Sequence, residues 1–168
     1  DFPAAALWAR RAAEGGSAEG QALLAYILGS GPEDLRNVAE SDRWYKQSAQ
    51  GGCAQGHLGH ALALARNVSA PEVQDEVVKH LRLAVDQGQA TALYLYAMLC
   101  ERGVGVPRDP ALASDYYRQA AQKGHVSAQA RWGFALTRGL GVPENQLEGE
   151  SWLRRAALAG DAEAAAVV

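Results

Sequence analysis

Small and apolar side chains recur along the chain in a pattern of constant period. The glycines Gly16, Gly52, Gly88, Gly124 and Gly160 are separated by 36 positions each, and each closes a similar phrase. The phrase reads Trp8-Ala9-Arg10-Arg11-Ala12-Ala13 at its first occurrence and Trp152-Leu153-Arg154-Arg155-Ala156-Ala157 at its last. Because five copies keep this register without insertion or deletion, we interpret the chain as an array of internal repeats.

Each repeat, numbered 1 to 36 with the glycine at 36, predicts two helices. Apolar or small residues at positions 4, 8, 9 and 12 form one face of a helix over positions 2 to 14, which corresponds to 90–102 in the third repeat and 126–138 in the fourth. Glycines and a proline then stop this first helix, as in Gly103-Val104-Gly105-Val106-Pro107. Position 21 holds residues that favour the N-cap of a second helix, which runs to about position 34. These residues are Asp1, Asn37, Asp109 and Asn145.

The pattern predicts an all-α fold, because no segment alternates with strand period. We expect a right-handed α-α superhelix, or solenoid, of 36-residue antiparallel helix pairs. We interpret residues 1–168 as a single solenoid domain. It comprises a half repeat 1–16, four whole repeats 17–52, 53–88, 89–124 and 125–160, and a partial repeat 161–168.

These phrases resemble the Sel-one-like repeat (SLR) family, relatives of the tetratricopeptide repeat. The third repeat carries the resemblance through Ala92, Ala97, Gly103, Gly105, Val106, Asp109, Tyr116, Ala120, Ala121 and Gly124, and the fourth through the equivalents from Ala128 to Gly160. The first repeat departs in its loop, Gly29-Ser30-Gly31-Pro32, and the second departs further over 66–71. The resemblance implies an interaction scaffold without catalytic residues or a cofactor, whose first helices line a concave surface.

Helical geometry indicates which face of each first helix stays free. At about 100° per residue, positions 3, 6, 7, 10 and 14 lie opposite the predicted buried face. Large apolar residues occupy position 10 and arginines occupy most of position 14, so this face suits a peptide with apolar anchors and acidic flanks. The predicted partner-binding residues are Leu23, Tyr26, Leu62, Leu95, Met98, Phe134, Arg66, Arg102, Arg131 and Arg138.

A second interpretation of position 10 is that its side chains are buried between neighbouring first helices. Tyr26 and Phe134 occur near the two ends of the array, where neighbours cover less surface. We therefore expect these two aromatic side chains to be the more exposed members of the strip.

Composition and charge limit the classes of partner. The chain carries 16 basic and 19 acidic residues, a net charge of -3, which gives no general attraction for nucleic acid. The basic residues at position 30 are therefore expected to be solvated or paired with carboxylates. They are Arg10, Lys46, Arg82, Arg118 and Arg154. No run of 18 apolar residues predicts a membrane span.

The histidines of the second repeat raise the question of a metal site. His60 at position 8 and His80 at position 28 should lie opposite each other in an antiparallel pair, and His57 lies one turn away from His60. Three imidazoles could bind zinc. The alternative, which we favour, is polar packing by hydrogen-bonded rings. Cys53 and Cys100 are too far apart along their helices for a disulfide, so we expect free thiols.

The sequence thus predicts a non-enzymatic scaffold or adaptor that binds a peptide or protein segment. The alternative is a structural spacer or oligomerisation module of a larger bacterial protein, with self-association through uncapped ends. A metal-binding or enzymatic role is the weakest hypothesis. The first residue is Asp1 rather than methionine, which indicates a processed or trimmed segment and leaves bacterial cytoplasm and periplasm both open.

Overall fold

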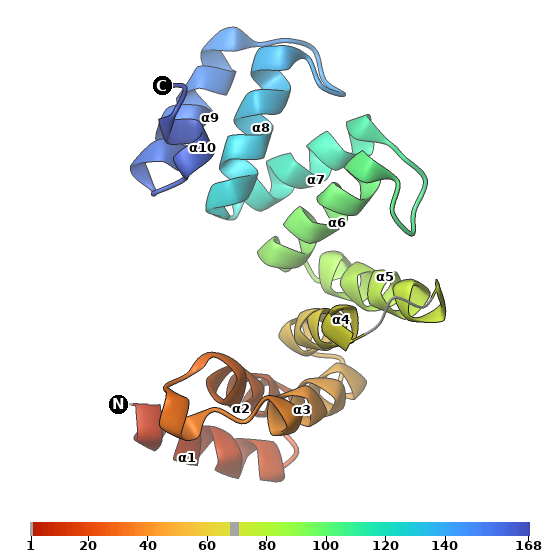
Figure 1. Ribbon diagram of the computed structural model, residues 1–168, viewed down its shortest axis with the longest axis vertical. Coiled ribbons are helices and arrows are strands. Elements are labelled where there is room, and N and C mark those ends of the chain that lie inside the picture. The colour runs from red at the N-terminus through yellow and green to blue at the C-terminus, as the bar shows by residue number, and fades with distance from the viewer. Residues whose placement is uncertain (1, 68–70) are drawn as a thin grey trace. The chain divides into compact units, whose positions relative to one another are not determined.

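The computed structural model describes residues 2–67 and 71–168, and the regular elements within these ranges are all helical (Figure 1). They are α1 (Phe2–Glu14), α2 (Ala18–Ser30), the short 3-10 helix η1 (Glu33–Leu35), α3 (Val38–Gln50), α4 (Ala54–Asn67), α5 (Pro71–Asp86), α6 (Ala90–Arg102), α7 (Pro110–Gln122), α8 (Val126–Arg138), α9 (Gln146–Leu158) and α10 (Ala162–Ala165). The all-α prediction is confirmed. The predicted bounds of the helices agree with these to within one or two residues, except that α5 begins three residues before the predicted start at 74.

The chain divides into two compact units, residues 1–87 and residues 88–168. In the N-terminal unit, α1 packs on α2, α2 on α3, α3 on α4 and α4 on α5. In the C-terminal unit, α6 packs on α7, α7 on α8, α8 on α9 and α9 on α10. Each unit is thus a row of helix pairs in which every helix contacts the next along the chain, as expected for a repeat array.

The buried face of each first helix is the one that the periodicity predicts. Positions 4, 8, 9 and 12 of the first repeat are Gly20, Leu24, Ala25 and Leu28, and all four are buried. The third and fourth repeats bury the same positions, whereas His60 and Leu64 of the second repeat remain partly exposed. Small residues dominate this face because the helices approach closely. A Cβ atom on Gly20, for example, would lie 2.6 Å from the Cβ of Ala12.

The predicted N-caps of the second helices are confirmed at the three described positions. Asn37, Asp109 and Asn145 each accept a hydrogen bond from the backbone N–H three residues on, the donors being Glu40, Leu112 and Glu148 at 3.0–3.2 Å. Such bonds satisfy N–H groups that the first turn of a helix leaves without partners. Asp1, the fourth predicted cap, lies outside the described residues, as does part of the 66–71 loop.

Loss of the Asp109 cap of α7 should destabilise the C-terminal unit in a measurable way. We expect Asp109→Ala to lower the free energy of unfolding by about 1 kcal/mol, because the N–H of Leu112 loses its acceptor. Urea unfolding followed by circular dichroism measures this change. Asp109→Asn is the matched control, since asparagine caps α3 and α9, and it should cost a few tenths of a kcal/mol at most. Equal losses in both variants would contradict a capping role.

Glycines end the first helices of the C-terminal unit by adopting left-handed backbone conformations. Gly103 has φ 72° and Gly139 φ 63°, and their N–H groups donate to the carbonyl oxygens of Leu99 and Ala135. Only glycine takes this conformation without strain, so the predicted stop signals act as expected. In the described part of the chain, no helix combines the length and apolar character needed to cross a membrane.

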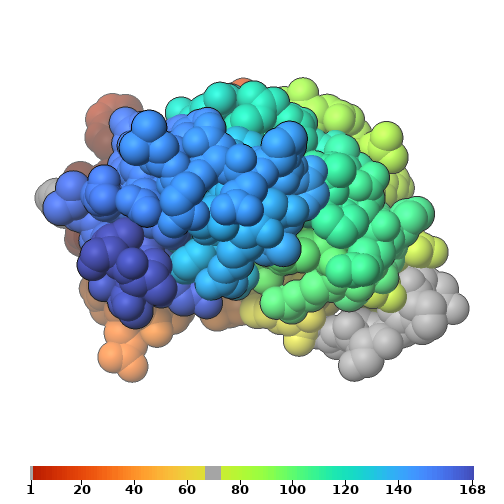
Figure 2. Space-filling model, turned by 90° about the horizontal axis from the view of Figure 1, so that it is seen from above, coloured from red at the N-terminus to blue at the C-terminus, as the bar shows by residue number. Residues whose placement is uncertain are grey.

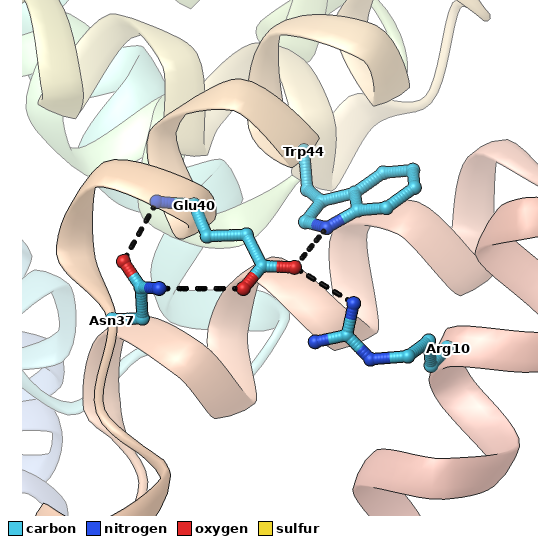
Figure 3. A network of polar contacts seen from close by, with 4 residues as sticks. All are labelled: Arg10, Asn37, Glu40 and Trp44. Carbon is cyan, nitrogen blue, oxygen red and sulfur yellow. Dashed lines mark hydrogen bonds and ion pairs between the residues drawn. The ribbon is translucent and has the colours of Figure 1, made fainter.

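Two second helices, α1 and α3, are joined by a polar network between neighbouring repeats. Glu40 of α3 accepts hydrogen bonds from Arg10 of α1 at 2.8 Å and from the indole of Trp44 at 3.2 Å (Figure 3). Asn37 completes the network by donating to the same carboxylate at 3.4 Å. The Arg10 guanidinium holds the pKa of Glu40 below its usual value. The network therefore ties α1 to the start of α3.

Basic residues at position 30 are paired with carboxylates in three of the five repeats. Besides Arg10, Arg118 pairs with Asp115 and Arg154 pairs with Glu150. The side chains of Lys46 and Arg82 are exposed. This agrees with the predicted solvated or carboxylate-paired face.

Candidate functional site

Three predicted binding residues of the N-terminal unit are exposed apolar side chains on helices that are in contact. Leu23 and Tyr26 of α2 are each 51% exposed, and Leu62 of α4 is 42% exposed. Helices α2 and α4 are in contact, so these three residues, the N-terminal patch, lie on neighbouring helices of one unit. Position 7 of the second repeat is Gly59, on α4. Tyr45 lies so close to it that a Cβ atom on Gly59 would be 2.1 Å from the tyrosine ring. Tyr45 therefore fills the place that a larger residue at position 7 would take.

In the C-terminal unit, three predicted binding residues line one cavity. Arg131, Phe134 and Arg138 of α8 face a pocket of about 330 Å³, the C-terminal pocket. Its other walls are Glu101 of α6, Ser114 and Tyr117 of α7, and the segment from Glu163 to Val167. Figure 2 shows this segment, in dark blue, beside the blue surface of α9, against which α10 packs. Leu95, Met98 and Arg102 do not line the pocket; the first two are partly buried on α6 and Arg102 is exposed.

Phe134 is less exposed than the sequence predicts. It packs against the buried cluster of Ala130, Leu153, Ala156 and Ala164, and the guanidinium of Arg138 lies 4.6 Å from the centre of its ring. Leu62, in contrast, is more exposed than Phe134. The expectation that Phe134 would be among the more exposed members of the strip is therefore wrong, because α9 and α10 cover a side of α8 that we expected to be open.

One end of the C-terminal pocket is polar and internally paired. Arg131 lies 3.8 Å from Glu163, and the hydroxyl of Tyr117 donates to Glu101 at 3.0 Å. Burial by itself lowers the pKa of Arg131, but the surrounding Glu163, Tyr117 and Glu101 outweigh it and raise the value. Burial and the Glu101 carboxylate raise the pKa of Tyr117, so this hydroxyl stays protonated near neutral pH. Arg131 is thus a structural cation with its counter-ions in place.

The other predicted arginines differ in whether the protein already supplies a carboxylate. Arg66 of the N-terminal unit forms an ion pair with Asp42 of α3. Arg102 and Arg138 have no carboxylate oxygen within 4 Å among the described residues. Arg138 and Phe134 also line a second cavity of about 370 Å³, whose walls include Thr137, Glu150 and Leu153. Arg102 and Arg138 are therefore the arginines left for an external anion.

Sequence reasoning missed the residues that complete the pocket from other helices. Tyr117 and Ser114 lie on a second helix, whose surface we did not expect to contribute. Glu163 lies at position 3 of the partial repeat, one of the positions that helical geometry assigns to the free face. Its position in the repeat was the one sequence feature that pointed to Glu163. That feature identifies a pocket residue only when the packing of α10 against α9 is known.

The three histidines of the second repeat meet, as their positions predict. The Nδ1 atoms of His57 and His80 are 2.9 Å apart, and the ring centres of His60 and His80 are 4.8 Å apart. Over residues 2–67 and 71–168, no group of three or more His, Cys, Asp or Glu side chains is arranged to hold a metal ion. Cys53 and Cys100 are both free, and burial raises the pKa of the Cys100 thiol. The arrangement is therefore one of contacting rings, as in the packing interpretation.

Comparison with solved structures gives several helical-repeat relatives. A protective antigen of uropathogenic Escherichia coli strains that displays an SLR fold matches with 27% identity and a TM-score of 0.81 over 95% of this chain and 34% of its own. A Sel1 repeat protein of Oxalobacter formigenes matches with 24% identity and a TM-score of 0.78 over 95% and 63%. Cysteine rich protein B of Helicobacter pylori matches with 18% identity and a TM-score of 0.60 over 76% and 96%. This chain thus spans about a third of the Escherichia coli protein and less than two thirds of the Oxalobacter one.

The sequence also matches the Sel1 repeat over residues 1–17, 18–53, 90–125 and 126–161. No curated protein matches the chain at a significant level. The segment without a match, between 53 and 90, contains the three histidines and the divergent loop. The matched segments cover well over half of the chain, in the register that the glycines predict, and the matching structures come from bacteria, in agreement with the expected origin. The chain therefore belongs to the Sel1 repeat family, whose members are generally non-catalytic helical scaffolds for protein–protein interaction.

Proposed function

We propose that this protein binds a peptide or protein segment through the free face of its first helices, with the C-terminal pocket as the main anchoring site. The observation that carries the proposal is the convergence of Phe134 and Arg138 on one cavity, in which no carboxylate of the described residues pairs with Arg138. An apolar side chain of the partner enters the pocket beside Phe134. An adjacent aspartate or glutamate of the partner pairs with Arg138.

The chemistry of the pocket supports a partner of this composition. Ala113, Ala135, Leu140 and Val167 give it apolar walls, so burial of an apolar side chain there removes surface from water on both molecules. Arg131 already has Glu163 as a counter-ion, whereas Arg138 has none among the residues that the structure describes. A partner with an acidic residue next to its apolar anchor thus gains a charge-assisted hydrogen bond that a basic partner cannot form.

The N-terminal patch supports a second, more apolar contact. Leu23, Tyr26 and Leu62 are exposed together, and tyrosine is a frequent anchor in protein interfaces. Arg66 beside them is neutralised by Asp42, so this region offers less attraction for an acidic segment than Arg138 does. We therefore expect the N-terminal patch to contribute apolar contacts.

Selection of random peptides displayed on phage against the full chain tests the proposal. We expect selected peptides to share a bulky apolar residue next to Asp or Glu. Phe134→Ala and Arg138→Glu should each weaken binding of such a peptide by about tenfold or more, and high salt should weaken it further. Arg82→Glu is the matched control, because it makes the same change of charge on an exposed second helix.

The Arg138→Glu variant separates an effect on binding from an effect on stability. This side chain is exposed, so Arg138→Glu should weaken binding by about tenfold or more while it shifts the unfolding transition only slightly. Selected peptides without an acidic residue, or equal binding by the Arg138→Glu and Arg82→Glu variants, would argue against the pocket.

A structural or oligomerisation role is the alternative function, and the apolar residues of α1 favour it. Helix α1 exposes Phe2, Leu7 and Trp8, of which Trp8 is 66% exposed. Leu7 and Trp8 are adjacent large apolar side chains, and such exposed side chains are typical of sites that pack on another protein segment. Sedimentation velocity at several concentrations tests this, because self-association through α1 should raise the sedimentation coefficient with concentration and Trp8→Glu should abolish the rise.

A further inference from the structure

The N-terminal unit holds a group of three contacting histidines, which we call the histidine cluster. His57 and His60 come from α4, and His80 comes from α5. The rings of His57 and His80 have centres 5.1 Å apart, and His60 meets His80 edge to face at 4.8 Å. His57 is buried, and the other two are partly buried. His80 thus contacts both histidines of the facing helix.

The contact between His57 and His80 depends on which of their ring nitrogens carry a hydrogen. Their Nδ1 atoms are 2.9 Å apart, so one Nδ1 must carry a hydrogen and the other must offer its lone pair. A proton added to the accepting Nδ1 leaves two N–H groups facing each other with no acceptor between them. The hydrogen bond that joins α4 to α5 therefore exists only while the accepting ring is neutral.

The third ring is equally sensitive to an added charge. Nδ1 of His60 is buried, and no group among the described residues forms a hydrogen bond with it. A charged imidazole needs partners for both N–H groups, and a buried N–H without an acceptor is costly. The neutral tautomer with its hydrogen on Nε2 avoids this cost, so the folded structure favours neutral His60.

The charged groups around the cluster come from α3 and α5 and have mixed effects. Glu76 of α5 lies 3.7 Å from Nε2 of His80 and favours one proton there, while Lys79 opposes it. Lys46 of α3 opposes a charge on His60, and Asp42 favours it although it is paired with Arg66. Burial lowers the pKa of all three histidines, and the neighbouring imidazoles lower those of His60 and His80 further. Glu76 can therefore offset one charge, but among the described residues no carboxylate forms an ion pair with His57 or His60 that would offset a second or third proton.

The third repeat shows that this packing position does not require histidine. Tyr96 and Tyr116 occupy the same positions as His60 and His80, and their rings also meet edge to face, at 5.4 Å. Leu93 stands at the position of His57. The same helix-pair contact is thus made elsewhere in the chain by side chains that do not gain a proton between pH 5 and 8. The histidines therefore make the stability of this helix-pair contact depend on pH.

We propose that the histidine cluster is a pH-sensitive latch that holds α4 against α5 while its rings are neutral and releases them when more than one ring is protonated. The release is expected under mildly acidic conditions. Because α4 carries Leu62 and Arg66, opening the latch also loosens the part of the N-terminal patch that α4 supplies.

The direction of the effect follows from the proton balance. An unfolded histidine has a pKa near 6.5, and the cluster lowers the pKa values in the folded protein. The unfolded state therefore binds more protons once the pH falls below about 6.5. The stability contributed by the cluster is complete above that pH and is lost as the pH falls through the lower folded pKa values. Each excess proton raises the unfolding equilibrium constant by up to about tenfold per pH unit.

The test uses the full chain with His125→Ser, so that the cluster contains the only histidines. His125 caps α8 through Nδ1, and Ser17 is the cap at the same position of the first repeat. Urea unfolding of the N-terminal unit, followed by amide hydrogen exchange of α4 and α5, is measured at pH 7.5 and 5.5 with EDTA. We expect the unfolding constant to rise about 10- to 100-fold between the two pH values. The variant His57→Leu/His60→Tyr/His80→Tyr, which copies the third repeat, should change less than about threefold.

A second measurement keeps the proposal testable if that variant does not fold. Proton NMR titration of the unsubstituted cluster should show at least two of the three rings titrating below pH 6.5, and His57→Gln, which copies Gln21 and Gln129, should reduce the dependence on pH. Three rings titrating at or above 6.5, or the same dependence on pH in the copied variant, would overturn the latch. A dependence that requires added Zn²⁺ and disappears in EDTA would also overturn it and indicate a metal site instead.

Discussion

Replacing Leu24 with alanine should lower the free energy of unfolding of the N-terminal unit by about 2–5 kcal/mol. Leu24 is 0% exposed and lies in a cluster with Ala9 and Ala13 of α1 and Ile27 and Leu28 of α2. Truncation loses the transfer free energy of the buried methyl groups and leaves a cavity. Ala9 and Ala13 have no rotamers with which to fill this cavity, so on the side of α1 we expect little relaxation. Urea unfolding followed by circular dichroism gives the value.

The neighbouring leucine is the matched control for this prediction. Leu23 differs from Leu24 by one position on α2 but is 51% exposed. Leu23→Ala should therefore cost less than about 1 kcal/mol, while it weakens partner binding if the N-terminal patch is used. Equal losses of stability for the two variants would mean that α2 does not bury the face assigned to it.

Adding one methyl group at Gly56 should also destabilise the N-terminal unit, by about 1–3 kcal/mol or more. A Cβ atom on Gly56 would lie 2.3 Å from Oγ of Ser48 and 2.6 Å from the backbone N of Ala49. The Ser48 hydroxyl cannot turn away freely, because it donates to the carbonyl oxygen of Ala18 at 2.6 Å. Gly56→Ala must therefore push α3 and α4 apart.

The expected destabilisation by Gly56→Ala is opposite in sign to the change in stability that helix propensity predicts. Alanine is favoured over glycine in a helix interior by about 0.5–1 kcal/mol, so propensity alone predicts that Gly56→Ala stabilises. Ala65→Gly, at an exposed site of the same helix, measures the propensity term separately. Thermal and urea unfolding of both variants give the comparison. A Gly56→Ala protein more stable than the parent would show that α3 and α4 have room to separate.

The repeat architecture could be predicted from the sequence to a high degree because its signals are local. Helix ends depend on the N-caps Asn37, Asp109 and Asn145 and on stop glycines such as Gly103, and each acts through its own backbone neighbours. The buried face follows from periodicity, which needs only the geometry of one helix. These features repeat every 36 residues, so each copy supports the interpretation of the others.

The candidate binding site could be predicted only in part, because its properties depend on neighbouring helices. Position within the repeat made Arg66, Arg102, Arg131 and Arg138 candidates together. Two of them, Arg66 and Arg131, have carboxylates supplied by α3 and α10, which leaves Arg102 and Arg138 for a partner. Phe134 was expected to be exposed but is covered from α9 and α10. A side chain's counter-ion and cover come from other segments, and the sequence of its own helix does not contain them.

Gly56 and the histidine cluster show which properties follow from the sequence and which depend on the tertiary structure. The sequence by itself determined the period, the helix pairs, the face that each first helix buries and the positions at which His60 and His80 would meet. The first and second repeats carry Gly20 and Gly56 at a position where the third and fourth carry Ala92 and Ala128, so comparison of repeats does not decide whether alanine is tolerated at Gly56. Only the tertiary structure showed that α3 approaches too closely for it, and that His57 and His80 bring two Nδ1 atoms to 2.9 Å. Periodicity fixes the direction in which a side chain points, whereas the distance to the next helix depends on every side chain packed between the two.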